Sequence, residues 1–259
     1  MSSSKVFLGV FLILAAPGAA IADWVQSGKL TANDGDFHDN FGYSVAISGN
    51  KAIVGAVLDE DNGPQSGSAY LFDVASGEQL AKLTAQDGAT DDRFGWSVGL
   101  SGNTAIVGAY GKDDDGTDSG SAYLFDVTSG LQLAKLTAHD AAAEDWFGVS
   151  VAISGNTAIV GARWDDDFGN NSGSAYLFDV ASGEQLAKLT PVDGEGPDEF
   201  GRAVAISGHT AIVGAYLDSD NGLWSGSAYV FVPEPSTWLM LCSLLPALSV
   251  ARWWRRKHK

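Results

Sequence analysis

The residues best suited to chemistry are aspartates in short loops between apolar segments. One set of loops reads D-x-D-x-G three times, with the pairs Asp59–Asp61, Asp165–Asp167 and Asp218–Asp220. Alternate carboxylates around a glycine turn can direct several hard oxygens at one Ca²⁺ ion. The pattern favours calcium as a cofactor. The alternative is that Asp, Asn and Gly form stable turns and keep the surface soluble.

Three aspartate columns recur at a spacing of 53 residues. The first (Asp34, Asp87, Asp140, Asp193) and the second (Asp39, Asp92, Asp145, Asp198) lie in the loops before each Phe-Gly, and the third (Asp61, Asp114, Asp167, Asp220) lies in the loops that read D-x-D-x-G. In the second repeat, Lys112 interrupts the D-x-D-x-G pattern. Weak calcium sites would suffice outside the cell. Repeat by repeat, the candidate calcium ligands are Asp34, Asp39, Asp59 and Asp61; Asp87, Asp92 and Asp114; Asp140, Asp145, Asp165 and Asp167; and Asp193, Asp198, Asp218 and Asp220.

No catalytic pattern accompanies the acids. The histidines between residues 23 and 232 occupy non-equivalent positions in the repeats, and no glycine-rich phosphate loop opens a helix. A carboxylate pair could serve a glycosidase, but carboxylates are too abundant for any one pair to be informative. We expect a protein that is not an enzyme, with a secreted carbohydrate-active hydrolase as the alternative.

Aromatic residues are the main departures from the repeat pattern in the loops. Trp146, Trp164, Phe168 and Trp224 have no aromatic counterpart in most of the other repeats. Such side chains can stack on sugar rings or fill a protein interface, and the alternative is that they cover neighbouring loops.

The net charge of the chain is −17, and the repeats are more acidic still because basic residues cluster at the C-terminal end. Like charges repel, so nucleic acid and anionic membrane surfaces are poor partners for the repeats. Cations and basic proteins are better ones.

The loops are positioned by a unit that is written four times. Phe-Gly begins at Phe41, Phe94, Phe147 and Phe200, and Gly-Ala and Gly-Ser-Ala-Tyr follow at the same spacing. The repeat boundaries are about 30–82, 83–135, 136–188 and 189–232. Each unit predicts four strands, which in the second repeat span 94–101, 104–110, 121–127 and 131–138. A Ser-Gly-Asn turn joins the first two strands.

Strand faces that separate large from small side chains suit sheets stacked around an axis. The fold class is therefore all-β, a β-propeller of four four-stranded blades. The last unit lacks its fourth strand, and residues 24–31 align with that strand in the other units. We expect this N-terminal strand to close the ring, which would remove exposed edges. An open or dimeric ring is the alternative. The recurrent Lys29, Lys82, Lys135 and Lys188 lie on the outermost strands, where charge protects an edge.

The order FG, GA, GSAY resembles the FG-GAP repeats of integrin α-subunits and bacterial surface proteins, over residues 23–232. The resemblance implies a propeller and a role in adhesion or extracellular interaction. The integrin-like family carries a calcium motif in the loop before the Gly-Ala strand. Here that loop is only Ser48-Gly49-Asn50 or its equivalent, so the family calcium site does not transfer to it.

The two ends predict addresses rather than fold. Residues 1–22 are typical of a signal peptide, with cleavage between Ala22 and Asp23. Residues 233–259 begin with Pro233, Glu234 and Pro235, continue with a short apolar segment and end in a basic tail. This order resembles the PEP-CTERM sorting signal of Gram-negative bacteria. The resemblance implies recognition by an exosortase-type protease, with transient membrane contact through the apolar segment.

Together these patterns predict an exported, non-catalytic propeller at the cell surface or in the extracellular polysaccharide matrix of a Gram-negative bacterium. It would mediate adhesion or another extracellular interaction, assisted by calcium, with a protein or glycan of unknown identity. Besides the hydrolase, the competing function is a purely structural matrix protein.

Overall fold

The computed structural model describes residues 24–234, which contain fifteen strands and no helix. Accordingly, this part of the chain holds no helix long and apolar enough to cross a membrane. The expected signal peptide with Ala22 and Asp23, and the C-terminal segment from Pro235 onward, lie outside the described residues. Pro233 and Glu234 follow the last strand directly.

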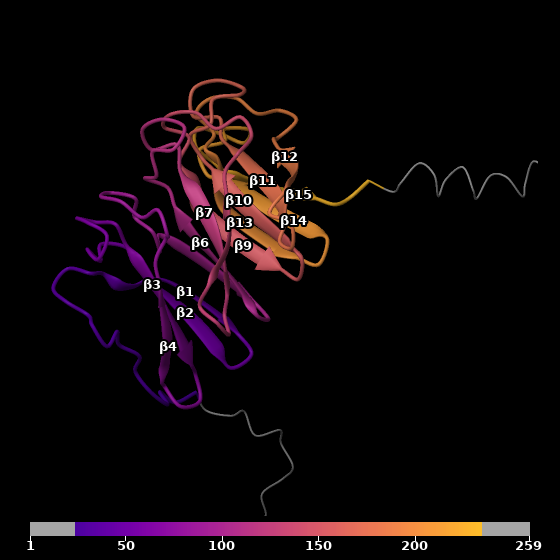
Figure 1. The fold of residues 1–259 in the computed structure, drawn as a ribbon. Coiled ribbons are helices and arrows are strands. Elements are labelled where there is room, and N and C mark those ends of the chain that lie inside the picture. Colours follow the sequence, from indigo (N-terminus) through magenta and orange to yellow (C-terminus); the bar gives the residue numbers. More distant parts are fainter. Residues whose placement is uncertain (1–23, 235–259) are drawn as a thin grey trace, which may run out of the picture.

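The strands form four antiparallel sheets in which neighbours in sequence are neighbours in space, here called blades 1 to 4 (Figure 1). This confirms the all-β fold class and its four repeated blades. Blade 1 holds β1 (Phe41–Ser48), β2 (Lys51–Ala56), β3 (Ser68–Asp73) and β4 (Gln79–Leu83); blade 2 holds β5 (Ser97–Ser101), β6 (Thr104–Ala109), β7 (Ser121–Asp126) and β8 (Gln132–Leu136); blade 3 holds β9 (Phe147–Ser154), β10 (Thr157–Ala162), β11 (Ser174–Asp179) and β12 (Gln185–Leu189); and blade 4 holds β13 (Phe200–Ser207), β14 (Thr210–Ala215) and β15 (Ser227–Phe231).

The turns between the first two strands of each blade are as tight as expected. Ser48 pairs with Lys51 across the β1–β2 turn, and the other three blades repeat this pairing. Gly49 has a φ of 58°, in the left-handed region that a two-residue hairpin of this type requires. The turn between the first two strands of each blade is therefore too short to form a calcium cage.

Neighbouring blades pack large side chains against smaller ones. Phe94, Tyr123 and Phe125 of blade 2 share one buried cluster with Ile53 and Leu71 of blade 1. The same arrangement joins blades 2 and 3. Each interface buries several large apolar side chains, each stabilising by about 1.5–3 kcal/mol, so most of the stability lies between blades.

The glycines of the repeat allow backbones of neighbouring blades to meet. A Cβ on Gly55 would overlap the carbonyl oxygen of Gly95 in the next blade, and the Ser44 hydroxyl donates to that oxygen at 2.7 Å. Phe94 forms a parallel bridge with Gly67 of blade 1. We predicted that β5 begins at Phe94, but it begins at Ser97, whereas β9 and β13 begin at Phe147 and Phe200, which form the same kind of bridge.

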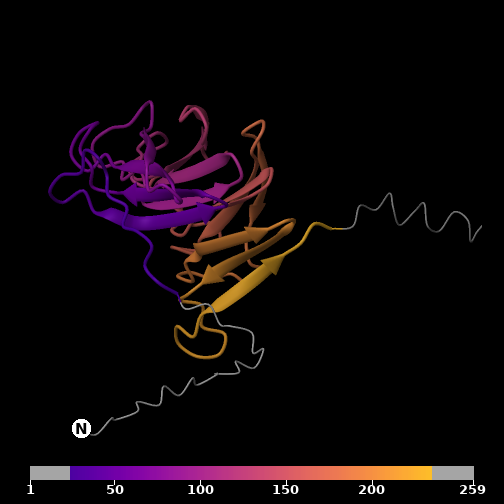
Figure 2. The ribbon, with the colours of Figure 1, turned by 90° about the horizontal axis from the view of Figure 1, so that it is seen from below.

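The prediction of a fourth strand for blade 4 is wrong for the single chain. Residues 24–31 form no strand, and β13, β14 and β15 make up the whole sheet. The first strands of successive blades contact one another in the pairs β1–β5, β5–β9 and β9–β13. Among the described residues, no comparable contact joins β13 to β1. The blades lie along an open arc (Figure 2). Matching faces decide which blades adjoin, whereas the rotation between blades decides how many complete a turn.

Candidate functional site

The acidic loops of blade 1 meet around a lysine. Lys82 Nζ lies 2.8 Å from Asp34 Oδ2, 3.0 Å from Asp59 Oδ2 and 2.5 Å from Asp61 Oδ2. Asp34 comes from the loop before β1, and the other two aspartates come from the loop between β2 and β3. An ammonium group therefore stands at the centre of three predicted calcium ligands.

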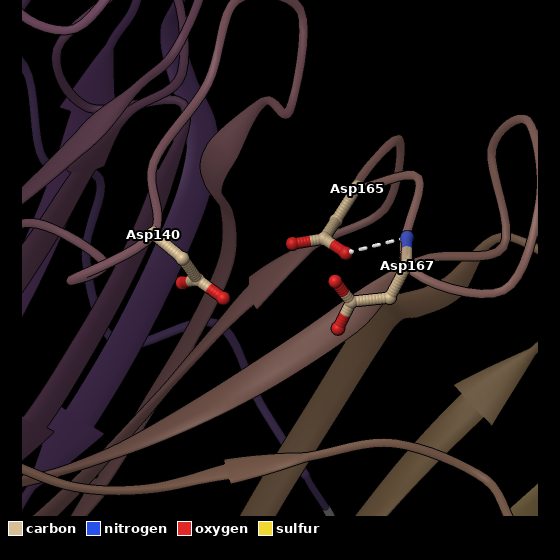
Figure 3. Close-up of side chains that lie close together, drawn as sticks. All are labelled: Asp140, Asp165 and Asp167. Carbon is tan, nitrogen blue, oxygen red and sulfur yellow. Dashed lines mark hydrogen bonds between the residues drawn. The ribbon is translucent and has the colours of Figure 1, made fainter.

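Blade 3 repeats this cluster in detail. Lys188 Nζ lies 2.7 Å from Asp140, 3.0 Å from Asp165 and 2.5 Å from Asp167. Figure 3 shows the three aspartates converging, with the Asp167 amide donating to Asp165 Oδ1 at 3.2 Å. Among the described residues, these are the only three acids that form a group of three with one oxygen of each within 4.8 Å of the others.

In blade 2, two lysines pair with the clustered aspartates. Lys135 pairs with Asp87 and Asp114, and Lys112 takes the place of the third aspartate. Lys112 turns away to Asp92 Oδ2 at 3.2 Å and donates to the Asp87 carbonyl at 2.7 Å. The substitution therefore replaces one carboxylate by a second ammonium group, so blade 2 has two lysines for three aspartates, where blade 1 has one lysine for three.

Blade 4 has the same aspartates but no lysine, because it has no fourth strand. Asp193, Asp218 and Asp220 occupy the equivalent positions, and Tyr229 donates its hydroxyl to Asp218 Oδ2 at 2.6 Å. The negative charge of Asp218 raises the pKa of Asp220. The raised pKa of Asp220 is what we expect where neighbouring carboxylates have no lysine between them.

The lysines also control the acids of the first three blades. The hydrogen bond from Lys82 lowers the pKa of Asp34. Burial opposes ionisation of Asp59 and Asp140, but hydrogen bonds from the neighbouring lysines outweigh it and keep both pKa values low. Burial likewise opposes the charge of Lys82, yet its three carboxylate partners raise its pKa. Both partners are therefore charged at neutral pH.

The second predicted column, Asp39, Asp92, Asp145 and Asp198, has a structural role, and of its members only Asp92 pairs with a lysine, Lys112. Each member accepts a hydrogen bond from a backbone amide three residues earlier and closes its own loop. The four bonds are Asp36 N to Asp39, Ala89 N to Asp92, Ala142 N to Asp145 and Glu195 N to Asp198, at 2.6–2.8 Å. Burial raises the pKa of Asp145 to about 6, as expected for a buried carboxylate without a direct cation.

A second feature of the loop end is a continuous row of aromatic rings across blades 1 to 3. Tyr43 contacts Trp96, which contacts Tyr110, which contacts Trp146, each with ring centroids 4.6 Å apart. The ring centroids of Trp146 and Trp164 lie 3.8 Å apart. These residues, together with Arg163 and Glu199, are called the aromatic row below.

The far end of the aromatic row contains polar atoms without partners. The Arg163 guanidinium lies over Trp146 at 4.4 Å, and its Nη1 is 3.5 Å from Glu199 Oε2. Trp146 Nε1, Trp164 Nε1, Arg163 Nε and Glu199 Oε2 are buried without a hydrogen-bond partner. Burial raises the pKa of Glu199. Glu199 Oε2 is ion-paired with Arg163 and Arg202, and the remaining unpaired atoms can take hydrogen bonds from water or from a ligand.

A cavity of about 510 Å³ opens beside the aromatic row. Arg93, Tyr110 and Trp146 line it together with acids from the neighbouring loops, among them Asp91 and Asp118. Its walls combine aromatic surface, a guanidinium and carboxylates. That combination suits a polar ligand with apolar faces.

The sequence pointed to part of this arrangement. It identified Trp146 and Trp164, but Phe168 and Trp224 are exposed and do not join the row. It missed Tyr43, Trp96, Tyr110 and Arg163, which are marked only by unequal residues at equivalent positions of the repeat. The lysines do lie on the outer strands, but their partners show a role beyond protecting an edge.

Four stacked antiparallel blades at a constant spacing of 53 residues define this chain as a repeat protein of the β-propeller class. The family model described as FG-GAP repeat matches residues 24–72, 78–125, 131–178 and 184–231. The chain therefore belongs to the FG-GAP repeat family. Such propeller repeats are typical of extracellular domains for interaction and adhesion.

No curated protein matches the chain. Among solved structures, the chain is similar to the computationally designed Ika8 protein, with 18% sequence identity and a TM-score of 0.45. The match covers 74% of this chain and 46% of that one. The chain thus spans less than half the length of the designed protein.

Proposed function

We propose that the chain is an exported, non-catalytic propeller that binds a glycan or protein of the extracellular matrix in the cavity beside the aromatic row. The observation that carries this proposal is the cavity lined by Arg93, Tyr110 and Trp146, where stacked rings and charged groups meet and the repeats differ most. The acidic clusters of blades 1 to 3 are satisfied internally, so they stabilise the loops that frame the cavity.

The sequence patterns at the two ends of the chain are what support export in this proposal. Removal of residues 1–22 and processing at Pro233-Glu234-Pro235 by an exosortase-type protease would deliver the repeats to the cell surface or matrix. Mass spectrometry of the protein recovered from a Gram-negative host tests both steps. Unprocessed ends would contradict this part alone.

A glycan array probed with the full chain, with and without Ca²⁺, tests the ligand. We expect binding to a small set of glycans that Trp146→Ala abolishes, whereas Trp224→Ala, an exposed loop tryptophan outside the row, leaves it unchanged. Binding that survives Trp146→Ala would contradict the site. Silence on the array and in protein pull-downs would favour the purely structural role.

Hydrolysis is the second candidate, and Glu199 is the reason to retain it. A carboxyl group with a raised pKa beside aromatic rings is a common environment for a general acid. Turnover of a bound glycan that Glu199→Gln abolishes would favour this function over plain binding.

Calcium fits blade 4 better than the other blades. The ammonium groups of Lys82, Lys135 and Lys188 take the central position in blades 1 to 3, so a cation there would have to displace them. Asp193, Asp218 and Asp220 leave that position free of any group of their own blade. Calorimetric titration of the full chain with Ca²⁺ tests the prediction, and Asp220→Asn is the matched variant. An absence of heat and an unchanged melting temperature would contradict it.

A further inference from the structure

The last blade exposes a face that every other blade buries. Ile53, Ile106 and Ile159 are fully buried beneath the next blade. Their counterpart Ile212 is 43% exposed, and Val230, on the same face of blade 4, is 63% exposed. The face of blade 4 is therefore built as one half of a blade interface.

The first blade exposes the opposite half. Val45 and Ile47 of β1 are 69% and 65% exposed. Their counterparts in blade 3, Val151 and Ile153, are each only 9% exposed because blade 2 covers them. The two ends of the arc thus carry complementary halves of an interface that occurs three times inside the molecule.

At each end of the arc, backbone groups that bridge neighbouring blades elsewhere have no partner from another blade. Gly173 bridges Phe200 between blades 3 and 4, which leaves the equivalent Gly226 at one end and Phe41 at the other. In the first three blades a Cβ added to the Gly-Ala glycine would overlap a carbonyl oxygen of the next blade. The equivalent Gly214 meets only its own Ala203 within 4 Å. These positions predict the register in which a further blade would dock.

Residues 26–31 hold the place of a fourth strand that belongs to a preceding blade. They read Q-x-x-K-L-T, as do β4, β8 and β12 with the residue that follows. A Cβ on Gly77 would lie 3.9 Å from Leu30 Cδ2, and a Cβ on Gly130 would lie 3.8 Å from Leu83 Cδ2. The segment therefore rests against blade 1 as β4 rests against blade 2.

The charges at the two ends match as well. Lys29 is the counterpart of Lys82, whose ammonium sits among three aspartates. Blade 4 has the aspartates Asp193, Asp218 and Asp220 without a lysine. A preceding blade completed by residues 26–30 would place Lys29 in that cluster, so Lys29 and the Ca²⁺ ion proposed above would compete for the same three aspartates.

We propose that two copies of this chain join head to tail into one ring of eight blades. Blade 4 of each copy stacks on blade 1 of the other, and residues 26–30 of that second copy form the missing strand beside β15. A head-to-tail contact yields a closed ring when its rotations complete a turn. The arc is still open at four blades, and eight lie within the range of known propellers. Closure also removes the unpaired edge of β15.

Disulfide trapping tests the pairing directly. By the repeat spacing, Val230 lies opposite Gly28 as Leu177 lies opposite Ala187. A Cβ at Gly28 meets nothing within 4 Å. We expect full-length Gly28→Cys/Val230→Cys, in a Cys242→Ser background, to give a covalent dimer under non-reducing denaturing conditions. The matched control Leu177→Cys/Ala187→Cys should close within one chain, and each single variant should stay monomeric.

Two results would overturn the proposal. A Gly28→Cys/Val230→Cys chain that closes only on itself would show a four-bladed ring completed by its own segment. A chain that forms no disulfide, while the blade 3 control does, would show that nothing docks beside β15.

The lysine supplies an independent test. Light scattering should give a mass of about twice 27.0 kDa for the full chain, corrected for bound detergent. Lys29→Glu should raise the dimer dissociation constant at least tenfold, Lys29→Arg should leave it close to that of the parent chain, and Asp220→Lys should restore assembly to Lys29→Glu. A monomeric parent chain, or a Lys29→Glu variant that assembles like the parent, would contradict the ring.

Discussion

Blade 3 and blade 4 have nearly the same sequence pattern but different surroundings. Blade 3 has a neighbour on each face and a fourth strand that carries Lys188. Blade 4 has one neighbour, three strands and no lysine among its aspartates. Equivalent residues are therefore buried and paired in one blade and exposed or unpaired in the other. In a repeat protein, each unit takes its stability largely from its neighbours, and this pair of blades separates that contribution from the sequence itself.

The largest expected difference is in core packing. Ile159→Ala removes a fully buried side chain between blades 3 and 4 and should lower the free energy of unfolding by about 3 kcal/mol. Ile212→Ala, at the exposed equivalent, should cost under about 1 kcal/mol in the single chain. Urea titrations of both variants check this. Equal costs in dilute protein would mean that blade 4 is already covered, and a cost of Ile212→Ala that grows with protein concentration would support the ring.

The next difference is electrostatic. Lys188→Met leaves buried Asp165 without its cation, and we expect a loss of about 2–3 kcal/mol, since Asp140 and Asp167 are half exposed and partly screened. Lys29→Met, the equivalent change with no partner in the single chain, should change stability by less than about 0.5 kcal/mol. Thermal unfolding at low and high salt measures both variants. An unchanged Lys188→Met would show that the cluster contributes nothing.

The pH dependence should separate two kinds of carboxylate in blade 3. Lys188 keeps the pKa of Asp140 low, so its contribution is present above the unfolded value and is lost as the pH falls below about 4. The pKa of Asp145 is raised to about 6, so ionisation of this carboxyl group opposes folding. The protonated form stabilises the fold at low pH, and this contribution is lost as the pH rises through about 6.

Asp145→Asn should therefore stabilise the chain at pH 7.5 by about 1–2 kcal/mol, because the amide oxygen can still accept the bond from Ala142. The gain should vanish near pH 4. Asp198→Asn in blade 4 is the comparison, since burial raises the pKa of Asp198 as well. Melting temperatures across pH 4–8 give the result, and a variant less stable than the parent at pH 7.5 would contradict the raised pKa.

Much of the fold could be predicted because the repeat has a constant length. The spacing of Phe41, Phe94, Phe147 and Phe200 defined four blades, and the Ser-Gly-Asn turns defined the hairpins. Closure could not be predicted in the same way. Residues 24–31 match a fourth strand in sequence, but whether they reach blade 4 depends on the accumulated rotation between blades, which no single residue specifies.

The candidate site could be predicted only in part. The recurrent acids marked the loop end correctly, but Asp39 and its equivalents close loops while Asp34, Asp59 and Asp61 meet. The lysines and the aspartates recur at the same spacing of 53 residues, which is consistent with their contact. That spacing indicates the contact only once the fourth strand is known to pass both loops. The aromatic row combines unlike residues at equivalent positions, such as Tyr110 and Arg163 or Trp146 and Glu199, so a search for identical residues at a constant spacing does not reveal it.

The smallest difference between the two blades concerns one hydroxyl. Ser150 of blade 3 donates to the Gly201 carbonyl at 2.7 Å, and Ala203 stands at the equivalent position of blade 4. Ser150→Ala should cost about 1 kcal/mol, because the Gly201 carbonyl loses its donor within a packed interface. Ala203→Ser should leave the dilute chain unchanged but tighten the dimer, since the new hydroxyl would face Gly42 of the second copy. Urea titration and light scattering measure the two effects, and a dimer weakened by Ala203→Ser would show that blades 4 and 1 do not meet as blades 3 and 4 do.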